Sequence, residues 1–130
     1  MTETVAAATR AAPPEADSGS GRLRVVFLLQ VPAVAQQQFL DAYQRIRYQV
    51  AAVEGYLGDQ LCQSTTDPCE WMIVSEWQSP EHFYDWERTP EHRTLAEPLV
   101  ACTTQRRSTR YLVRLQTQGA TVAPAEGGAR

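Results

Sequence analysis

The apolar positions of this 130-residue chain change their spacing from one segment to the next. An unbroken run, Val-Val-Phe-Leu-Leu, predicts a strand over residues 23–31 that is buried on both faces. From Phe39 to Val53 the apolar side chains recur at steps of three and four, which predicts an amphipathic helix over residues 33–54. Gly55 follows as a typical helix-ending residue.

A β-hairpin is predicted after this helix. Two strand-like stretches, residues 56–66 and 70–77, flank Asp67 and Pro68, a dipeptide typical of tight turns. The two strands are therefore expected to pair antiparallel.

Two short helices and a last strand complete the pattern. Ser79 stands before a proline, a typical start for a helix, and predicts one over residues 80–88. Thr89 before a second proline repeats the signal and predicts a helix over residues 90–101. Polar and apolar residues then alternate over 105–116, which predicts a strand with two different faces.

The resulting order, βαββαβ, predicts an α+β fold of the ferredoxin-like kind. It has a four-stranded antiparallel sheet with its helices on one face. We expect one domain over residues 22–117 between two disordered tails, residues 1–21 and 118–130, which are rich in Ala, Pro, Ser and Gly. Because the first strand is apolar on both sides, the sheet's other face needs a cover. A second copy would supply it, so we predict a homodimer in the form of a dimeric α+β barrel.

Composition narrows the function classes. A net charge of −3 argues against a nucleic-acid partner. No apolar stretch approaches the length of a membrane span or signal peptide, so we expect a cytoplasmic protein with no membrane partner. There is no lysine, which excludes Schiff-base chemistry on a lysine. Four arginines of the last strand are interpreted as a solvated edge or dimer-contact strip: Arg106, Arg107, Arg110 and Arg114.

The three cysteines are Cys62, Cys69 and Cys102. Their odd number and wide spacing do not indicate a disulfide framework, and no Cys-x-x-Cys pair suggests zinc. Reduced structural thiols are expected. Pairing of Cys62 with Cys69 across the hairpin stays open.

Aromatic residues gather where the third strand meets the next helix, and all three tryptophans lie between residues 71 and 86. Trp71, Ile73 and Trp77 share strand parity, and Trp86 approaches from the helix. Together they predict a flat apolar slot suited to a fused-ring ligand. The alternative is that Trp77 belongs purely to the core.

Few side chains can move a proton near neutral pH. His82 and His92 are the two histidines, and either is a candidate base for a phenol. Arg93 is a candidate to neutralise the resulting anion. For all three, a plain surface position is the alternative. Glu76, on the strand face opposite Trp77, is interpreted as paired with an arginine of the last strand across the dimer, or as lying inside the barrel.

Two motifs carry a resemblance to a known family. The first is Gly55-Tyr56, ahead of the second strand. The second begins Ser75-Glu76-Trp77 and continues, after one residue, as Ser-Pro-Glu-His-Phe. Over about residues 23–116 the chain resembles the antibiotic biosynthesis monooxygenase family. Those proteins are small dimeric α+β barrels of aromatic polyketide pathways, and the quinone-forming members use oxygen without metal, flavin or haem.

The resemblance also implies site residues. Trp77 matches the tryptophan that lines the family's pocket, and Phe83 stands where some members carry tyrosine. Ile73 and Phe27 stand where different branches carry asparagine. Trp86 stands where many members carry histidine. The implied substrate-binding residues are thus apolar at positions that are polar elsewhere in the family.

These observations predict a cofactor-independent monooxygenase that oxidises a phenolic polycyclic aromatic polyketide to a quinone. The substrate would stack on Trp77 and Trp86, with molecular oxygen as co-substrate and no cofactor. An aromatic polyketide cyclase on the same fold is the first alternative. A non-catalytic dimeric partner of a polyketide pathway enzyme is the second.

Overall fold

The computed structural model describes residues 21–120. The tails expected at the two ends therefore lie outside the described residues, apart from Gly21 and residues 118–120. A compact unit extends from Gly21 to Leu112, and the fold described below is that unit. Its elements, in chain order, are β1 (Leu23–Gln30), a 3₁₀ turn η2 (Ala33–Ala35), α2 (Gln36–Val50), β2 (Tyr56–Gln63), β3 (Glu70–Trp77), α3 (Pro80–Glu87), α4 (Pro90–Val100) and β4 (Gln105–Leu112).

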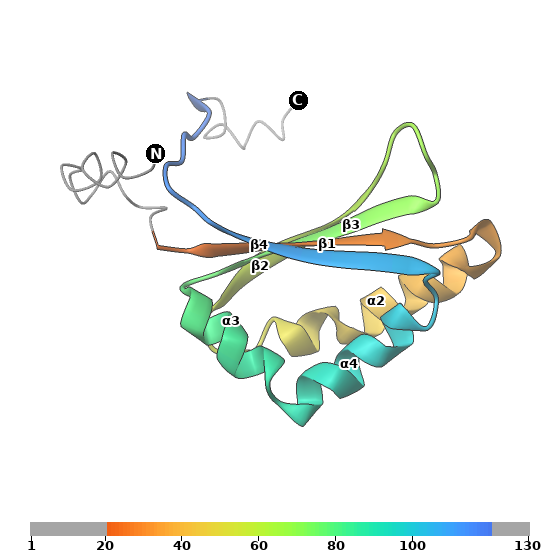
Figure 1. Cartoon of the computed structure of the whole chain (residues 1–130), viewed down its shortest axis with the longest axis horizontal. Helices are drawn as coiled ribbons and strands as arrows, with labels where there is room; N and C mark the ends of the chain where they lie inside the picture. Colours follow the sequence, from red (N-terminus) through yellow and green to blue (C-terminus); the bar gives the residue numbers. More distant parts are fainter. Residues whose placement is uncertain (1–20, 121–130) are drawn as a thin grey trace, which may run out of the picture. The chain divides into compact units, whose positions relative to one another are not determined.

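The four strands form one antiparallel sheet in the order β2-β3-β1-β4. Helices α2, α3 and α4 all lie on one side of this sheet, as Figure 1 shows. The unit is thus the predicted ferredoxin-like α+β arrangement. The other face of the sheet carries no helix of the compact unit.

Local signals in the sequence place the helix starts correctly. The Ser79 hydroxyl accepts a hydrogen bond from the His82 backbone N–H at 3.3 Å, and Thr89 caps α4 in the same way at 3.2 Å. Each cap is followed by a proline at the first helical position, where its missing N–H costs nothing. Thr89 also ends α3, because its hydroxyl donates a hydrogen bond to the Trp86 carbonyl at 2.7 Å.

Three predicted elements extend several residues beyond the observed ones. The strand expected over residues 56–66 ends at Gln63, because the Ser64 hydroxyl accepts hydrogen bonds from the next turn's backbone N–H groups. The strand expected over 105–116 ends at Leu112, which pairs with Leu23, the first residue of β1. Beyond that pair β1 offers no further partner. The helix expected over 33–54 is regular only between Gln36 and Val50.

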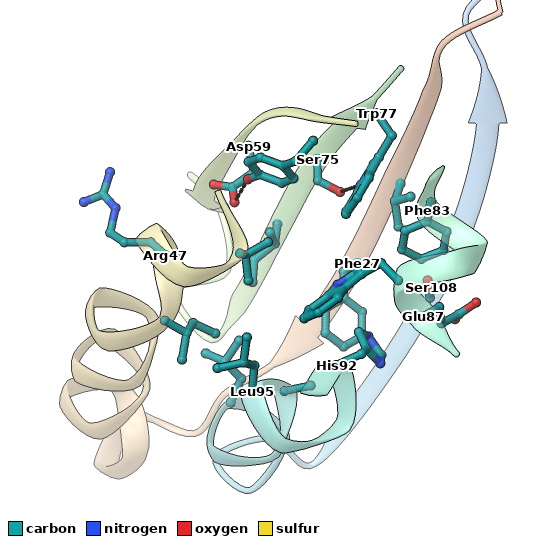
Figure 2. A pocket seen from close by; sticks show the side chains of 18 of the residues that line it. Phe27, Arg47, Asp59, Ser75, Trp77, Phe83, Glu87, His92, Leu95 and Ser108 are labelled. Carbon is teal, nitrogen blue, oxygen red and sulfur yellow. Dashed lines mark hydrogen bonds between the residues drawn. The ribbon is translucent and has the colours of Figure 1, made fainter. Parts of the chain in front are cut away.

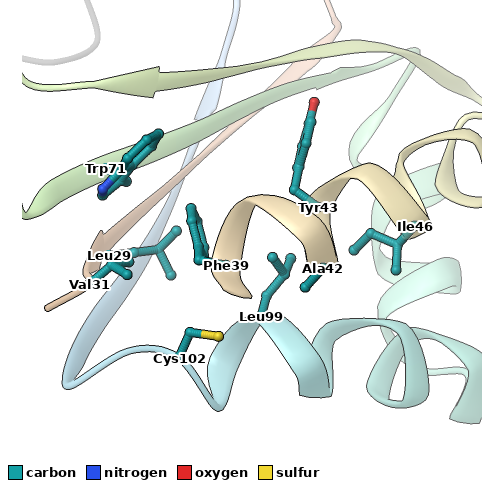
Figure 3. Close-up of a cluster of buried hydrophobic side chains, with 9 residues drawn as sticks. All are labelled: Leu29, Val31, Phe39, Ala42, Tyr43, Ile46, Trp71, Leu99 and Cys102. Atoms are coloured by element: carbon teal, nitrogen blue, oxygen red, sulfur yellow. The ribbon is translucent and has the colours of Figure 1, made fainter. Parts of the chain in front are cut away.

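Most of the hydrophobic core lies between α2 and one end of the sheet (Figure 3). Phe39 is fully buried there and meets Trp71 edge-on, with ring centroids 5.4 Å apart. We call this cluster the filled core, and its buried members are Leu29, Val31, Phe39, Ala42, Tyr43, Ile46, Trp71, Leu99 and Cys102. A second cluster, the Trp77 cluster, holds Leu23, Val25, Trp77 and Phe83 near the other end of β1 and β3.

Candidate functional site

A cavity of about 290 Å³ lies between the sheet and the three helices. Its walls are mostly apolar, and every strand and helix contributes to them. Ser108, an exposed residue of β4, lies at its edge. Its size is at the lower end of the range for small-molecule sites, roughly 300–1,000 Å³. Most of the predicted site residues line it (Figure 2): Phe27, Ile73, Trp77, Phe83, Trp86 and His92.

His82 and Arg93, two of the three predicted catalytic residues, are not among the cavity-lining residues. The His82 Nδ1 atom is 2.8 Å from the Ser79 hydroxyl oxygen, so the ring is held at the start of α3. It also packs on Gly55, where an added Cβ would lie 2.2 Å from the His82 Cγ. The His82 ring therefore joins Gly55, in the loop between α2 and β2, to the start of α3. Arg93 is exposed on α4.

Trp77 forms a fixed wall of the cavity. It is only 2% exposed, and its indole N–H donates to the Ser75 hydroxyl at 3.1 Å. The rings of Tyr56 and Phe83 meet it edge-on, with centroids 5.2 and 5.4 Å away. Trp77 therefore belongs to the core and also forms a wall of the cavity, two roles that the sequence presented as alternatives.

Trp71 does not line the cavity, although it shares strand parity with Trp77. It stands at the opposite end of β3, inside the filled core. Parity sets the face of the sheet and says nothing about position along the strand. The predicted slot consequently has two tryptophans, Trp77 and Trp86.

Arg110 is exposed, as expected of a solvated edge, and it also lines the cavity. It pairs with Val25 in the sheet register, which places its side chain on the helix-covered face. Its guanidinium donates to a Glu87 carboxylate oxygen at 2.5 Å and lies 5.2 Å from the centre of the Phe83 ring. Alternation along β4 predicted two faces but could not tell which one the helices cover.

His92 enters the cavity from the first turn of α4. Its ring meets Trp86 edge-on at 5.7 Å between centroids. Burial lowers the pKa of His92 below 6.5, and the charges of Arg93 and Arg110 lower it further, while Glu87 acts in the opposite direction. The imidazole is therefore neutral at pH 7 and able to accept a proton.

A second polar group lies across the cavity, and the sequence analysis missed it. The Tyr43 hydroxyl donates to Asp59 Oδ1 at 2.5 Å, and the Tyr56 hydroxyl donates to Asp59 Oδ2. We call these three residues the Asp59 cluster, and all three line the cavity. Figure 2 shows Asp59 and His92 on opposite sides of the cavity.

A β-bulge explains why Asp59 was missed. Tyr56 pairs with Trp77, but the register then shifts, so that Asp59 pairs with Ser75 on the same face. In an unbroken strand, residues three apart point to opposite faces. The only sequence signal was Gly58, since glycine within a strand often marks a bulge.

Glu76 lies on the open face of the sheet. It forms ion pairs with Arg22 and Arg24 of its own chain, with nitrogen–oxygen distances of 3.4 and 3.5 Å. Arg22 precedes β1 and Arg24 belongs to it, so these ion pairs form within one chain, and the pairing expected across the dimer stays a prediction. In the hairpin Cys62 pairs with Met72 and not with Cys69, and all three thiols are free.

Within residues 21–120, no group of three His, Cys, Asp or Glu side chains is arranged to hold a metal ion. The same part of the chain contains no helix that is both long and apolar enough to cross a membrane.

Sequence comparisons relate the chain to one protein family and to three Streptomyces proteins. A family model described as "Antibiotic biosynthesis monooxygenase" matches residues 22–98. The chain is 48% identical over 105 residues to a 42.8 kDa protein in the whiE locus of Streptomyces coelicolor, covering 81% of the chain. It is 39% identical to protein SchA of Streptomyces halstedii and 41% to the polyketide synthase CurD of Streptomyces cyaneus, covering 88% and 82% of the chain. The chain spans only 26% to 31% of the length of these relatives.

Solved structures share the fold at low sequence identity. SnoaB, a cofactor-independent oxygenase from Streptomyces nogalater, superposes with a TM-score of 0.68 at 15% identity, covering 77% of this chain and all of SnoaB (100%). The heme-degrader MhuD from Mycobacterium tuberculosis superposes with a TM-score of 0.62 at 22% identity, covering 74% of this chain and 99% of MhuD. At these identities the likeness concerns the fold alone.

Proposed function

Because the chain belongs to the antibiotic biosynthesis monooxygenase family, we propose that it oxidises a phenolic polycyclic aromatic polyketide with molecular oxygen. The product is a quinone, and no cofactor takes part. One observation carries the proposal: an apolar cavity walled by Trp77 and Trp86 holds a neutral imidazole, that of His92. The whiE-locus, SchA and CurD relatives support a place in polyketide tailoring.

The reaction needs only the substrate's own electrons. An ionised phenol is electron-rich enough to reduce oxygen, so the ring carbon para to the hydroxyl forms a bond to one oxygen atom. Two hydrogens leave the ring system, and the second oxygen atom departs as water. The carbon is oxidised and oxygen is reduced, in the balance phenol plus O₂ gives quinone plus water. The protein has to bind the ring, accept the phenolic proton and exclude bulk water.

His92 accepts the phenolic proton in this proposal. Its low pKa leaves the imidazole unprotonated before substrate arrives, and its position beside Trp86 brings it to the edge of a stacked ring. Arg110 supplies positive charge on the same side of the cavity, where it can stabilise the developing anion. Its ion pair with Glu87 holds the guanidinium in place.

The aromatic rings fix the plane of the substrate. Trp77 and Phe83 form one rigid wall, since both are at least nine-tenths buried. Trp86 is partly exposed and forms the wall on the helix side. Phe27 and Ile73 form the floor on the sheet, and they face each other in the β1–β3 register. A flat fused ring system fits such a lining better than a flexible chain does.

We further propose that the protein is a homodimer that pairs its two open sheet faces. Four apolar side chains are contiguous on that face through the β1–β3 register: Val26, Leu28, Met72 and Val74. Tyr111 extends the patch and is 56% exposed. Sedimentation velocity tests this, and Val26→Glu should convert the dimer to a monomer. A monomeric parent chain would contradict it.

Oxygen uptake tests the oxidation. The protein is incubated with an anthrone or a dihydroxynaphthalene, and oxygen consumption is followed together with quinone absorbance. One atom of labelled oxygen is expected in the quinone. Arg110→Gln should slow the reaction, whereas the matched change Arg88→Gln, on an exposed residue of the α3–α4 junction, should not. If the parent protein accelerates neither oxygen uptake nor quinone formation, the oxidation is excluded.

A cyclase is the second candidate. Phe27, Ile73 and Trp86 make the cavity apolar at three positions where the family resemblance implies polar groups. A cavity of that kind can direct ring closure of a poly-β-ketone by shape alone. An oxygen-independent change in the ring pattern of such a substrate would support this candidate over the oxidase.

A further inference from the structure

We propose that the Asp59 cluster is a hydroxyl-binding subsite, which receives a neutral phenolic or enolic O–H at the end of the substrate opposite His92. The proposal rests on the proposed function for the reacting end of the ring. It adds a second requirement, namely that the substrate carries hydrogen-bond donors at both ends. No feature of the sequence pattern had indicated it.

Hydrogen bonding within the cluster fixes which groups face the ligand. Both tyrosine hydroxyls donate to the Asp59 carboxylate, one to each oxygen. Their protons are thereby committed, and the lone pairs of the two phenolic oxygens remain. Each carboxylate oxygen also has further acceptor capacity, because a carboxylate accepts about four hydrogen bonds. The cluster therefore offers acceptors to the cavity and no donor.

The electrostatics of the cluster keep it in this state. Burial, together with the hydrogen bond to Asp59 and its negative charge, raises the pKa of Tyr43 to about 12. The same causes, in the same order, raise the pKa of Tyr56 further. Both phenols therefore stay protonated throughout the physiological range. Among the described ion pairs none involves Asp59. Arg47 also lines the cavity, 5.5 Å from the centre of the Tyr43 ring, where its charge opposes the rise in both tyrosine pKa values, but Figure 2 shows its guanidinium directed away from Asp59.

These properties select the chemistry of the ligand. A group that meets only acceptors around a carboxylate must donate a hydrogen bond and must not be an anion. A neutral hydroxyl satisfies both conditions, whereas a methyl ether fails the first and a carboxylate or a phenolate fails both. The opposite side of the cavity differs, because it holds the Arg110 guanidinium and the His92 imidazole. A fused-ring phenol is thus oriented with its ionising hydroxyl at His92 and a neutral hydroxyl at Asp59.

Ligand pairs that differ only in donors provide the test. The probes are a naphthalene with one hydroxyl on each ring, its monomethyl ether and its dimethyl ether. Binding is measured without oxygen by quenching of tryptophan fluorescence, since Trp77 and Trp86 line the cavity. The parent protein should bind the diol roughly ten- to a hundredfold more tightly than the monomethyl ether, the range expected for a hydrogen bond to a charged acceptor.

Asp59→Asn keeps the side-chain shape but removes the charge and adds an N–H₂ donor. In this variant the preference for the diol over the monomethyl ether should fall to about twofold, the statistical value for two equivalent hydroxyls. Asp41→Asn is the matched control, because Asp41 is exposed on α2 and accepts a hydrogen bond from Gln37 of the same helix. It should keep the parent preference. An equal preference in the Asp59 and Asp41 variants would overturn the subsite.

A second variant covers the case in which Asp59→Asn does not fold. Tyr56→Phe removes the hydroxyl that donates to Asp59 Oδ2. This carboxylate oxygen is a stronger acceptor than a phenolic oxygen, and it becomes available to the ligand. The variant's preference for the diol should rise above that of the parent, and an unchanged or lower preference would count against direct contact with Asp59. Because these measurements exclude oxygen, they can succeed even if the oxidation fails. Conversely, the oxidation is supported if oxygen is consumed even though Asp59→Asn leaves the preference for the diol unchanged.

Discussion

The two ends of β3 carry a tryptophan each on the same face of the sheet, and their surroundings differ. Trp71 packs into the filled core against Phe39, where α2 presses its buried face on the strands. Trp77 stands beside a cavity, above which α3 and α4 meet at the Thr89 break. The contrast shows that two tryptophans on one strand and one face can both be buried, while only the one at the end that precedes α3 also forms a cavity wall.

The two regions also differ in their polar and charged groups. The filled core contains no ion pair among its buried members and one hydroxyl, that of Tyr43, which reaches toward the cavity. The cavity has a carboxylate bound by two phenols on one side and an imidazole near a guanidinium on the other. The two regions share three buried residues, Tyr43, Ile46 and Leu99, so a division between stability and function applies to residues that lie in one region alone, such as Phe39 and Trp86. Mutations of such residues should separate accordingly.

The largest effect is expected in the filled core. Phe39→Ala removes a fully buried ring and should lower the free energy of unfolding by about 3–5 kcal/mol. Urea denaturation followed by circular dichroism measures it. Tyr48→Ala, on the same helix but 71% exposed, serves as the control and should change the free energy by less than about 0.5 kcal/mol. A similar loss in both variants would mean that the filled core is not where the stability resides.

Gly55→Ala should come next, at about 1–3 kcal/mol. Gly55 has a φ of 86°, and an added Cβ would lie 2.2 Å from the His82 Cγ. Two causes therefore act together, a left-handed backbone and a collision. Combining the change with His82→Gly separates them, because His82→Ala would leave the His82 Cβ 2.5 Å from the added methyl group. Only the backbone cost of about 1–2 kcal/mol should persist in the glycine background. Equal costs in both backgrounds would show that the His82 contact is not what requires glycine.

Trp86→Ala should cost little stability and much binding. Trp86 is partly exposed, so the free energy of unfolding should fall by only about 1 kcal/mol, well below the value for Phe39→Ala. Affinity for a fused-ring phenol should fall roughly tenfold, because a stacking surface is lost. Fluorescence titration on the remaining tryptophans gives the affinity. The distinction between the two regions fails if this variant unfolds as readily as Phe39→Ala.

The smallest effect is one of pH. Because the folded pKa of His92 is below 6.5, the unfolded chain binds the proton more readily between the two values. The free energy of unfolding should therefore fall as the pH drops below about 6.5 and stay level above it with respect to this residue. His92→Phe should remove that part of the acid sensitivity.

Tyr43 should give the opposite pH dependence in alkaline solution. Its pKa is higher in the folded chain, at about 12, than in the unfolded chain, so the free energy of unfolding should fall as the pH rises from 10 toward 12.

Local signals in the sequence were sufficient for the fold. Ser79 and Thr89 cap the helices they were expected to cap, and β3 begins at Glu70 and ends at Trp77 as predicted. Such features depend on neighbouring residues alone, so one sequence records them. The four-stranded antiparallel sheet with its helices on one face followed from the element order.

The site was harder to predict because it depends on contacts between distant residues. Asp59 reaches the cavity only through a bulge, which shifts the face on which every later residue of that strand lies. Arg110 lies under the helices because of its register with Val25, which alternation within β4 does not specify. His82 matched a family motif, yet its neighbour Gly55 gives it a packing role. His92 was assigned to the cavity on chemistry alone, and its catalytic role remains a prediction.

The extra residue between Tyr56 and Asp59 lets both side chains face the cavity although they lie three positions apart. If every residue of β2 paired in turn with β3, Asp59 would stand opposite Val74, and its carboxylate would turn to the open face of the sheet. The acidic group would then leave the ligand and enter the surface proposed to join two copies. A change that removes the bulge without deleting a residue would thus alter substrate choice and assembly in a single event.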